Sequence, residues 1–343
     1  MHDSLCLPRP APARPHTRFD HSLPRRQLSN NGSHHMYAIP RRPENPTLND
    51  WLPHYRELIA LRDIKDKTRQ DKLLWCMHLS ELIGDRALDT LRPSDIAGAG
   101  KAMQMRGLDT SARRVIIEAK DIFNEAVLSD WSYRNPADAV RPPRVKVRRM
   151  RLSAEVWKSM LSRCSRKSVA HRMLRLALVS AQRRADLSCM RFDQVFDGHL
   201  WVRQLKTGRQ IAIPLELALP EFGLVLGDVI EDCREAAKGS AFMLPKRNGM
   251  PSPPAKLSYE FIELRKLVLA ACDVPPGRTL PSLHEVRSLA ERSYRDIGVD
   301  TQALLGHKFP STTNTYNDGR GINDGQWKFV RLHPNTAAGA TMH

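Results

Sequence analysis

Cysteine is scarce in this sequence, and the few cysteines stand alone. No C-x-x-C pair occurs, so the sequence predicts neither a disulfide framework nor a zinc site, and it indicates a reducing cytosol. The six cysteines are Cys6, Cys76, Cys164, Cys189, Cys233 and Cys272.

Long apolar runs are missing as well. No stretch approaches the ~18 consecutive apolar residues of a membrane span, and we expect no signal peptide because the first residues lack its apolar core. The sequence is nevertheless 41% hydrophobic, which is enough to bury ordinary cores. Its length of 343 residues favours two domains and an additional tail.

Acidic residues are the minority among the charged ones. Lys and Arg outnumber Asp and Glu by 54 to 37, which gives a net charge of +17 and a pI of about 10.0. A surplus of this size favours a polyanionic partner, and nucleic acid is the commonest one. A basic protein without such a partner is the alternative that charge alone leaves open.

Composition also divides the chain. Residues 1–45 form a basic, proline-rich leader with too few apolar residues to offset the cost of ordering, so we expect disorder in isolation. Thr47 with Asp50 then predicts a helix start, and apolar residues at helical spacing predict a four-helix bundle within residues 46–140. Bundles of this kind carry many functions, so the bundle alone identifies none.

A basic segment, residues 141–151, follows the bundle, and its prolines keep it out of a helix. A linker that crosses the phosphate backbone of DNA would have this composition. A merely solvated run of charges is the alternative. The candidate DNA-contacting residues are Arg141, Arg144, Lys146, Arg148 and Arg149.

Three short motifs near the C-terminus carry chemistry-bearing residues. H-E-V-R-S-L at 284–289 places His284 and Arg287 on one face of a predicted helix. L-L-G-H-K at 304–308 contains His307, and T-N-T-Y ends at Tyr316. Each of these residues taken alone has a plain structural interpretation, such as packing or helix capping.

In this order and with these flanks, the motifs resemble the catalytic end of the tyrosine recombinases, most closely the integrases of lambda-like phages. That resemblance implies a further arginine and a lysine on a hairpin upstream. Arg183, in A-Q-R-R-A-D at 181–186, matches the first position. Alternating residues at 200–204 and 210–214 predict a hairpin, and its turn carries Lys206. Helices are predicted after the hairpin, from 221 to 237 and from 258 to 272.

The resemblance implies the role of each matched residue. Tyr316 would be the nucleophile that forms a 3′-phosphotyrosyl link, and Arg183 with Arg287 would stabilise the non-bridging phosphate oxygens. Lys206 would protonate the leaving 5′ oxygen. His284 and His307 would manage the tyrosine proton and bind the phosphate. Asp186 and Glu285 are candidates for supporting the catalytic residues: Asp186 would orient Arg183, and for Glu285 simple surface charge is the alternative.

The resemblance also implies a fold and partners. The fold class would be mainly α with a small β-sheet: a helical core-binding domain, residues 46–140, and a mixed α+β catalytic domain, residues 152–318. Residues 319–343 would be a tail whose strand, 327–332, packs on a neighbouring protomer or on its own domain. The expected partner is double-stranded DNA at attachment or core sites, bound by a homotetramer, with a host DNA-bending protein and a directionality factor as further candidates.

The implied activity is site-specific recombination of a phage or mobile element in the bacterial cytoplasm, without metal, ATP or other cofactor. The leader departs from the lambda-like pattern, because residues 23–32 match only the start of the module that binds outer arm sites. The alternatives are a type IB topoisomerase, a catalytically silent DNA-binding relative and a helical-bundle transcription factor. The last of these would make the matched set from Arg183 to Tyr316 a coincidence.

Overall fold

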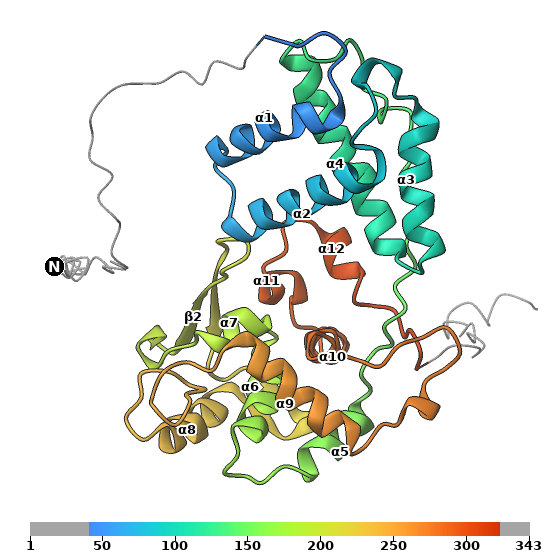
Figure 1. Ribbon diagram of the computed structural model, residues 1–343. Coiled ribbons are helices and arrows are strands. Elements are labelled where there is room, and N and C mark those ends of the chain that lie inside the picture. Colours follow the sequence, from blue (N-terminus) through green and yellow to red (C-terminus); the bar gives the residue numbers. More distant parts are fainter. Residues whose placement is uncertain (1–40, 323–343) are drawn as a thin grey trace, which may run out of the picture. The chain divides into compact units, whose positions relative to one another are not determined.

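The computed structural model describes residues 41–322, apart from the side chain of Ala271, and these residues form two compact units that divide between Val145 and Lys146. Each unit has its own buried core. Figure 1 shows the helices and strands of both units. The predicted leader lies almost wholly outside the described residues, as does the predicted strand at 327–332. Among the helices of residues 41–322, none combines the length and the apolar composition that a bilayer span requires.

The N-terminal unit is helical. Thr47 starts its first helix as predicted: the Thr47 hydroxyl accepts from the Asp50 amide at 3.2 Å, and the Asp50 carboxylate accepts from the Thr47 amide at 2.8 Å. Pro93 begins a later helix, where its fixed φ and missing N–H cost little. The elements are α1 (Leu48–Leu61), α2 (Asp66–Ile83), the 3₁₀ turn η1 (Leu88–Thr90), α3 (Pro93–Met105) and α4 (Asp109–Leu128).

Large aromatic side chains fill the core of this unit. Trp51, Tyr55 and Phe123 have no exposed surface, and each such burial contributes about 1.5–3 kcal/mol. The indole N–H of Trp51 donates to the Ile122 carbonyl at 3.0 Å, which satisfies its polar atom inside the core. The apolar spacing that predicted the bundle therefore corresponds to its buried faces.

The C-terminal unit is built around α6 (Val169–Ser180), which is buried on nearly all sides. Helices α8, α9 and α10 contribute to the same core, and Figure 1 shows α10 seen almost along its axis. The helical elements of this unit are α5 (Ala154–Ser162), α6, α7 (Arg184–Ser188), η2 (Phe192–Gln194), η3 (Pro220–Phe222), α8 (Leu226–Ala237), α9 (Pro254–Lys266), η4 (Ala271–Asp273), α10 (His284–Asp296), α11 (Thr301–Leu305) and α12 (Pro310–Asn314).

A small antiparallel sheet lies in the same unit. It has the order β1-β2-β3, and Trp201 of β2 pairs with Ala212 of β3, which confirms the predicted hairpin. Gly208, with φ of 70°, supplies the positive dihedral in the connecting turn. The strands are β1 (Val195–Phe196), β2 (His199–Arg203) and β3 (Gln210–Pro214), together with a separate pair, β4 (Ala218–Leu219) and β5 (Leu224–Val225).

Two predicted helices have different boundaries in the structure. A helical region was expected from 221 to 237, but α8 starts at Leu226, because Gly223 turns the chain at φ 61° and lets β5 pair with β4. A helix was also expected from 258 to 272, whereas α9 runs from Pro254 to Lys266, starting at a proline. The mainly α fold class with a small sheet is confirmed.

Candidate active site

Helix α10 supplies the two residues of the H-E-V-R motif. The helix starts at His284, so His284 and Arg287 are one turn apart, as their spacing predicted. Arg287 is only 1% exposed, whereas His284 keeps exposed surface at the helix start. A buried guanidinium is costly unless its N–H groups find acceptors.

Carbonyl oxygens hold Arg287 in place. Its Nη1 donates to the carbonyl of Ala181 at 2.5 Å, and its Nη2 donates to the carbonyl of Leu305 at 2.6 Å. Burial, followed by repulsion from Arg183, lowers the pKa of Arg287 to about 10, so the group is still charged at neutral pH. Because these carbonyl acceptors are neutral, the positive charge of Arg287 is not cancelled and can act on an anion.

Arg183 caps α7 and is linked to the same centre through Gln204. The Nη1 of Arg183 donates to the Gln204 side-chain oxygen at 2.6 Å. The Gln204 amide nitrogen in turn donates to the Leu305 carbonyl at 3.1 Å, the oxygen that also accepts from Arg287. Two arginines that are far apart in the sequence are thereby tied to one backbone carbonyl.

Sequence reasoning missed Gln204, although a signal was present. Leu200 and Val202 are the buried residues of β2, and strand alternation places Gln204 on the same inward face. A glutamine that is 1% exposed must satisfy its amide, and Gln204 donates to Gln182 as well, at 3.0 Å. An inward polar residue at a strand end was therefore the clue.

Tyr316 follows α12 and is 9% exposed. Its hydroxyl lies 3.2 Å from Nε2 of His284. Its ring stacks on His307, with 5.6 Å between the ring centroids and 20° between the planes. The phenol oxygen thus has an imidazole nitrogen within hydrogen-bond reach.

His307 connects Tyr316 to Arg287. Its Nε2 lies 3.4 Å from Nη2 of Arg287, and its Nδ1 lies 2.9 Å from the Thr313 hydroxyl. Because a guanidinium only donates, Nε2 must be the acceptor, and the proton of the neutral ring sits on Nδ1 facing Thr313. The 3.4 Å contact is long, so this bond is weak.

Both histidines are neutral at neutral pH. His284 keeps exposed surface, but the surrounding protein removes much of the water around its ring, and this loss of hydration, followed by repulsion from Arg287, lowers its pKa to about 4. Arg149, Arg183 and Arg151 add to the effect. Burial and the same Arg287 charge lower the pKa of His307 to about 4. An anion bound beside them would offset the repulsion and raise both pKa values.

Lys206 lies on the exposed turn of the β2–β3 hairpin. Gln204, at the end of β2, connects this hairpin to Arg183 and to the Leu305 carbonyl. Asp186 also binds the hairpin, because its carboxylate accepts from the Leu205 amide at 2.7 Å. We expected Asp186 to orient Arg183, but in the described contacts Gln204 accepts from Arg183. The structure therefore joins Arg183, His284, Arg287, His307 and Tyr316, with Lys206 on the adjoining hairpin.

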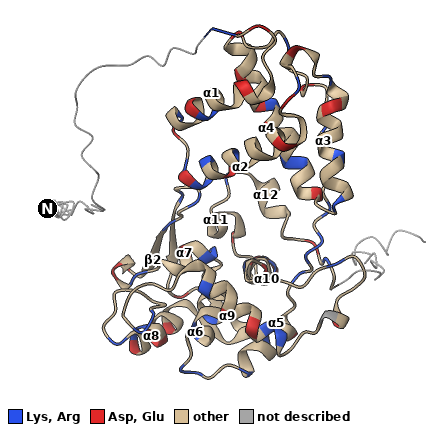
Figure 2. Ribbon diagram, in the orientation of Figure 1, with Lys and Arg blue, Asp and Glu red and all other residues tan. Residues whose placement is uncertain are grey.

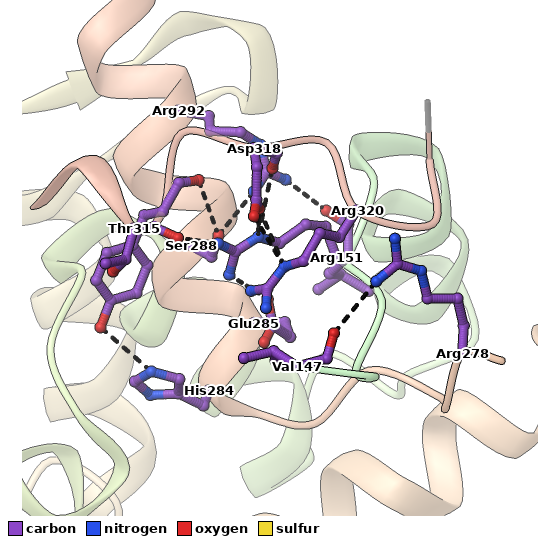
Figure 3. A network of polar contacts seen from close by, with 12 residues as sticks. Val147, Arg151, Arg278, His284, Glu285, Ser288, Arg292, Thr315, Asp318 and Arg320 are labelled. Carbon is purple, nitrogen blue, oxygen red and sulfur yellow. Dashed lines mark hydrogen bonds and ion pairs between the residues drawn. The ribbon is translucent and has the colours of Figure 1, made fainter. Parts of the chain in front are cut away.

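Sequence reasoning also missed a buried charge network beside Tyr316 (Figure 3). Arg151, which we assigned to the basic linker, is 2% exposed, and its Nη1 donates to Glu285 at 2.9 Å. Glu285 is 3% exposed, so the interpretation of this residue as surface charge is wrong. No short-range pattern indicates the pairing, because the two residues are 134 positions apart.

The five candidate DNA-contacting cations of the linker are all exposed: Arg141, Arg144, Lys146, Arg148 and Arg149. Figure 2 shows that basic residues also occur on helices of both units, interspersed with acidic ones. Arg149 pairs with Thr279 in an isolated bridge, and its charge contributes to the lowered pKa of His284.

Known proteins share both the sequence and the fold. The chain is 31% identical to the integrase of Escherichia phage HK022 over 80% of this chain and 76% of the relative. It is 34% identical to the prophage integrase IntE of Escherichia coli over 83% of this chain and 78% of the relative. A lambda integrase dimer bound to a COC′ core site matches with a TM-score of 0.75 at 28% identity, covering 84% of this chain and 81% of that one.

The fold and the site together define a site-specific DNA recombinase of the tyrosine class. The model of the phage integrase family matches residues 150–320. With the relatives above, this shows that the chain belongs to the phage integrase family. These findings do not favour the topoisomerase or the silent DNA-binding alternative.

Proposed function

We propose that Tyr316 is the nucleophile with which this recombinase cuts and rejoins DNA. The observation that carries the proposal is the phenol oxygen 3.2 Å from Nε2 of a neutral His284, beside the buried, charged Arg287. A phenol next to a proton acceptor and a phosphate-binding charge has what attack on a phosphodiester requires.

The proposed step conserves the bond energy of the phosphodiester. The Tyr316 oxygen bonds to phosphorus and the bond from phosphorus to the 5′ oxygen breaks, which leaves a 3′-phosphotyrosyl link and a 5′ hydroxyl. His284 accepts the phenol proton, and the phosphate charge raises its low pKa toward that task. Lys206 delivers a proton to the departing oxygen, and a 5′ hydroxyl from a partner strand then reverses the step.

Arg183 and Arg287 are proposed to donate to the non-bridging oxygens as charge grows on them. Both guanidinium groups are held in place by hydrogen bonds: Gln204 accepts from Arg183, and two backbone carbonyls accept from Arg287. His307 would donate a hydrogen bond to the same phosphate after its weak contact with Arg287 breaks. Arginines fixed before the reaction need little reorganisation during it.

The partner in this proposal is duplex DNA at attachment or core sites. Lambda integrase, which shares the fold, has been solved as a dimer on a core site and as a tetramer on a Holliday junction, the latter with a TM-score of 0.76 at 28% identity. We propose the same partner and a homotetramer here, integrating and excising a mobile element on bacterial chromosomal DNA. A host DNA-bending protein and a directionality factor complete the proposal.

The test is covalent trapping on a nicked suicide substrate carrying the recognised core site. Tyr316→Phe should form no protein–DNA adduct and should bind DNA within about 3-fold of the wild type, because only the nucleophilic oxygen is removed. Tyr259→Phe is the matched control, since Tyr259 lies exposed on α9, and it should form the adduct normally. An adduct formed by Tyr316→Phe would refute the assignment of the nucleophile.

A further inference from the structure

Arg151 grips the backbone on both sides of Tyr316. Its Nη2 donates to the carbonyl of Thr315, the residue before the tyrosine. Its Nε donates to the carboxylate of Asp318 at 2.7 Å and lies 3.3 Å from the carbonyl of the same residue, two positions after the tyrosine. One side chain thus spans the proposed nucleophile.

The same guanidinium is anchored to α10. Its Nη1 donates to Glu285 at 2.9 Å, and Glu285 adjoins His284, the partner of the tyrosine hydroxyl. The carbon of the Arg151 guanidinium lies 5.7 Å from the centre of the Tyr316 ring. Figure 3 shows Arg151 between Glu285 and Asp318, with Thr315 on the neighbouring segment.

A second layer of bonds joins the same segments. The Arg151 amide donates to the Arg320 carbonyl at 2.7 Å. Arg292 of α10 donates to the Leu152 carbonyl at 2.8 Å and to the Ser288 hydroxyl at 2.7 Å, and that hydroxyl donates to the Tyr316 carbonyl at 3.4 Å. These hydrogen bonds therefore connect three segments: residues 151–152, helix α10 and residues 316–320.

We propose that Arg151 is a positioning residue that holds the backbone around Tyr316 and so fixes the phenol relative to the phosphate-binding arginines. Arg151, Glu285 and Asp318 are called the tyrosine clamp below. The inference rests on the proposed function for its catalytic consequence, but the clamp itself is a property of the protein without DNA. Arg151 contacts backbone and carboxylates in this clamp and has no part in the proton transfers.

The geometry requires arginine. The clamp uses donors on three nitrogens that point in fixed directions to Thr315, Asp318 and Glu285. A lysine ammonium offers three donors from one atom and cannot span these acceptors. Removing Arg151 would also leave the buried Glu285 carboxylate without its partner, which is costly.

The clamp also couples the tyrosine to the segment that the sequence predicts to contact DNA. Arg148 and Arg149 are exposed and lie three and two positions before Arg151. The backbone there bonds to both polar groups of Thr279: the Thr279 amide donates to the Arg148 carbonyl at 2.9 Å, and the Met150 amide donates to the Thr279 carbonyl at 2.9 Å. A phosphate bound by Arg148 or Arg149 would therefore hold the segment that holds Tyr316. Through the clamp, the position of the Tyr316 phenol would depend on whether Arg148 and Arg149 bind DNA phosphates.

The experiment compares Arg151→Lys, Arg151→Met and Asp318→Ala in the full-length chain. We expect the single-turnover rate of adduct formation to fall about 10- to 100-fold for the Arg151 variants, because small displacements of a reacting group cost this much. DNA affinity should stay within about 3-fold, since Arg151 is buried. Asp318→Ala should lose less, because Arg151 keeps its bond to the Thr315 carbonyl.

Arg172→Met is the matched control. Arg172 is also a buried arginine, 7% exposed, and its Nη1 donates to the Lys167 carbonyl at 2.9 Å, at the other end of α6 from Arg183. Its loss should affect stability but leave the cleavage rate of folded protein unchanged. An equal loss of rate in Arg172→Met, or a rate near wild type in folded Arg151→Met, would overturn the proposal.

Hydrogen exchange without DNA separates this inference from the proposed function. Amides of residues 315–322 should exchange faster in the Arg151 and Asp318 variants, while those of α5 and α6 should not change. If Tyr316→Phe still formed the adduct, the proposed function would fail while the exchange result stood. If exchange of 315–322 were unchanged in Asp318→Ala, whose side chain is half exposed and can be lost without unfolding, the clamp would be refuted.

Discussion

Arg287 shows how one residue keeps a charge inside the C-terminal unit. Its two short hydrogen bonds go to backbone carbonyls, which compensate its loss of hydration without neutralising its charge. A carboxylate in their place would form an ion pair and weaken its attraction for a phosphate. The cost of this arrangement is visible in the lowered pKa values of the neighbouring histidines.

The two histidines predict a loss of stability in mild acid. Their pKa values fall from 6.5 in the unfolded reference to about 4 in the folded protein, so between these values the unfolded chain binds more protons. The free energy of unfolding should therefore decrease as the pH falls from 6.5 toward 4. Urea unfolding at pH 7 and pH 5 should show a smaller decrease for His307→Gln than for the wild type.

Asp300→Asn serves as the control for that comparison, because Asp300 caps α11 outside the histidine cluster. Its decrease between the two pH values should match the wild type. If His307→Gln also matched the wild type, the acid sensitivity would have another source.

At the scale of elements, the turn after α11 meets the β2–β3 hairpin at Gly306. Its φ is 61°, and a Cβ placed there would lie 2.8 Å from Ile211 Cδ1 and 3.1 Å from the Gln204 amide. Gly306→Ala should therefore strain the backbone and displace Gln204, the partner of Arg183. We expect a loss of about 2–3 kcal/mol in stability, together with slower adduct formation.

Gly298→Ala is the control for Gly306→Ala. Gly298 also has a positive φ, 82°, but a Cβ there would meet no atom of residues 41–322 within 4 Å. It should lose only about 1 kcal/mol from backbone strain, and its cleavage rate should be that of the wild type. Equal effects of the two substitutions would mean that the contact with Gln204 has no part in the site.

Local patterns predicted the elements that carry the site, and long-range contacts were beyond them. Helical spacing placed His284 and Arg287 on one face, and strand alternation predicted the hairpin with Lys206. The bond from Arg151 to Asp318 joins residues 167 positions apart, and no periodicity reports such a pair. The start of α8 was missed because a positive φ at Gly223 follows from strand pairing that the sequence does not display.

At the scale of the whole molecule, the net charge of +17 makes DNA affinity depend on salt. Each phosphate contact contributes about −0.9 to the slope of log K against log salt. Replacing Arg144 and Lys146 together by Gln should therefore make the slope shallower by about 1–2, as measured by fluorescence anisotropy on a core-site duplex. Both side chains are exposed, so the fold should be unaffected.

The control for net charge is Arg234→Gln combined with Lys256→Gln, which removes two positive charges, as the linker double variant does. Arg234 pairs with Glu231 and Lys256 with Glu260 on the surface of the C-terminal unit. Its salt slope should stay close to that of the wild type. If both double variants changed the slope equally, the linker would contribute only through overall charge.

The hydrogen bond from the Arg151 amide to the Arg320 carbonyl brings together the two ends of the stretch that the family model matches, residues 150–320. Gly321 also packs so closely on Met150 that a Cβ would lie 2.4 Å from its Cβ. A domain whose termini are neighbours can be grafted between other modules with little distortion. Residues 150–320 could therefore be joined to other DNA-binding domains, by evolution or by protein engineering, with little change to their fold.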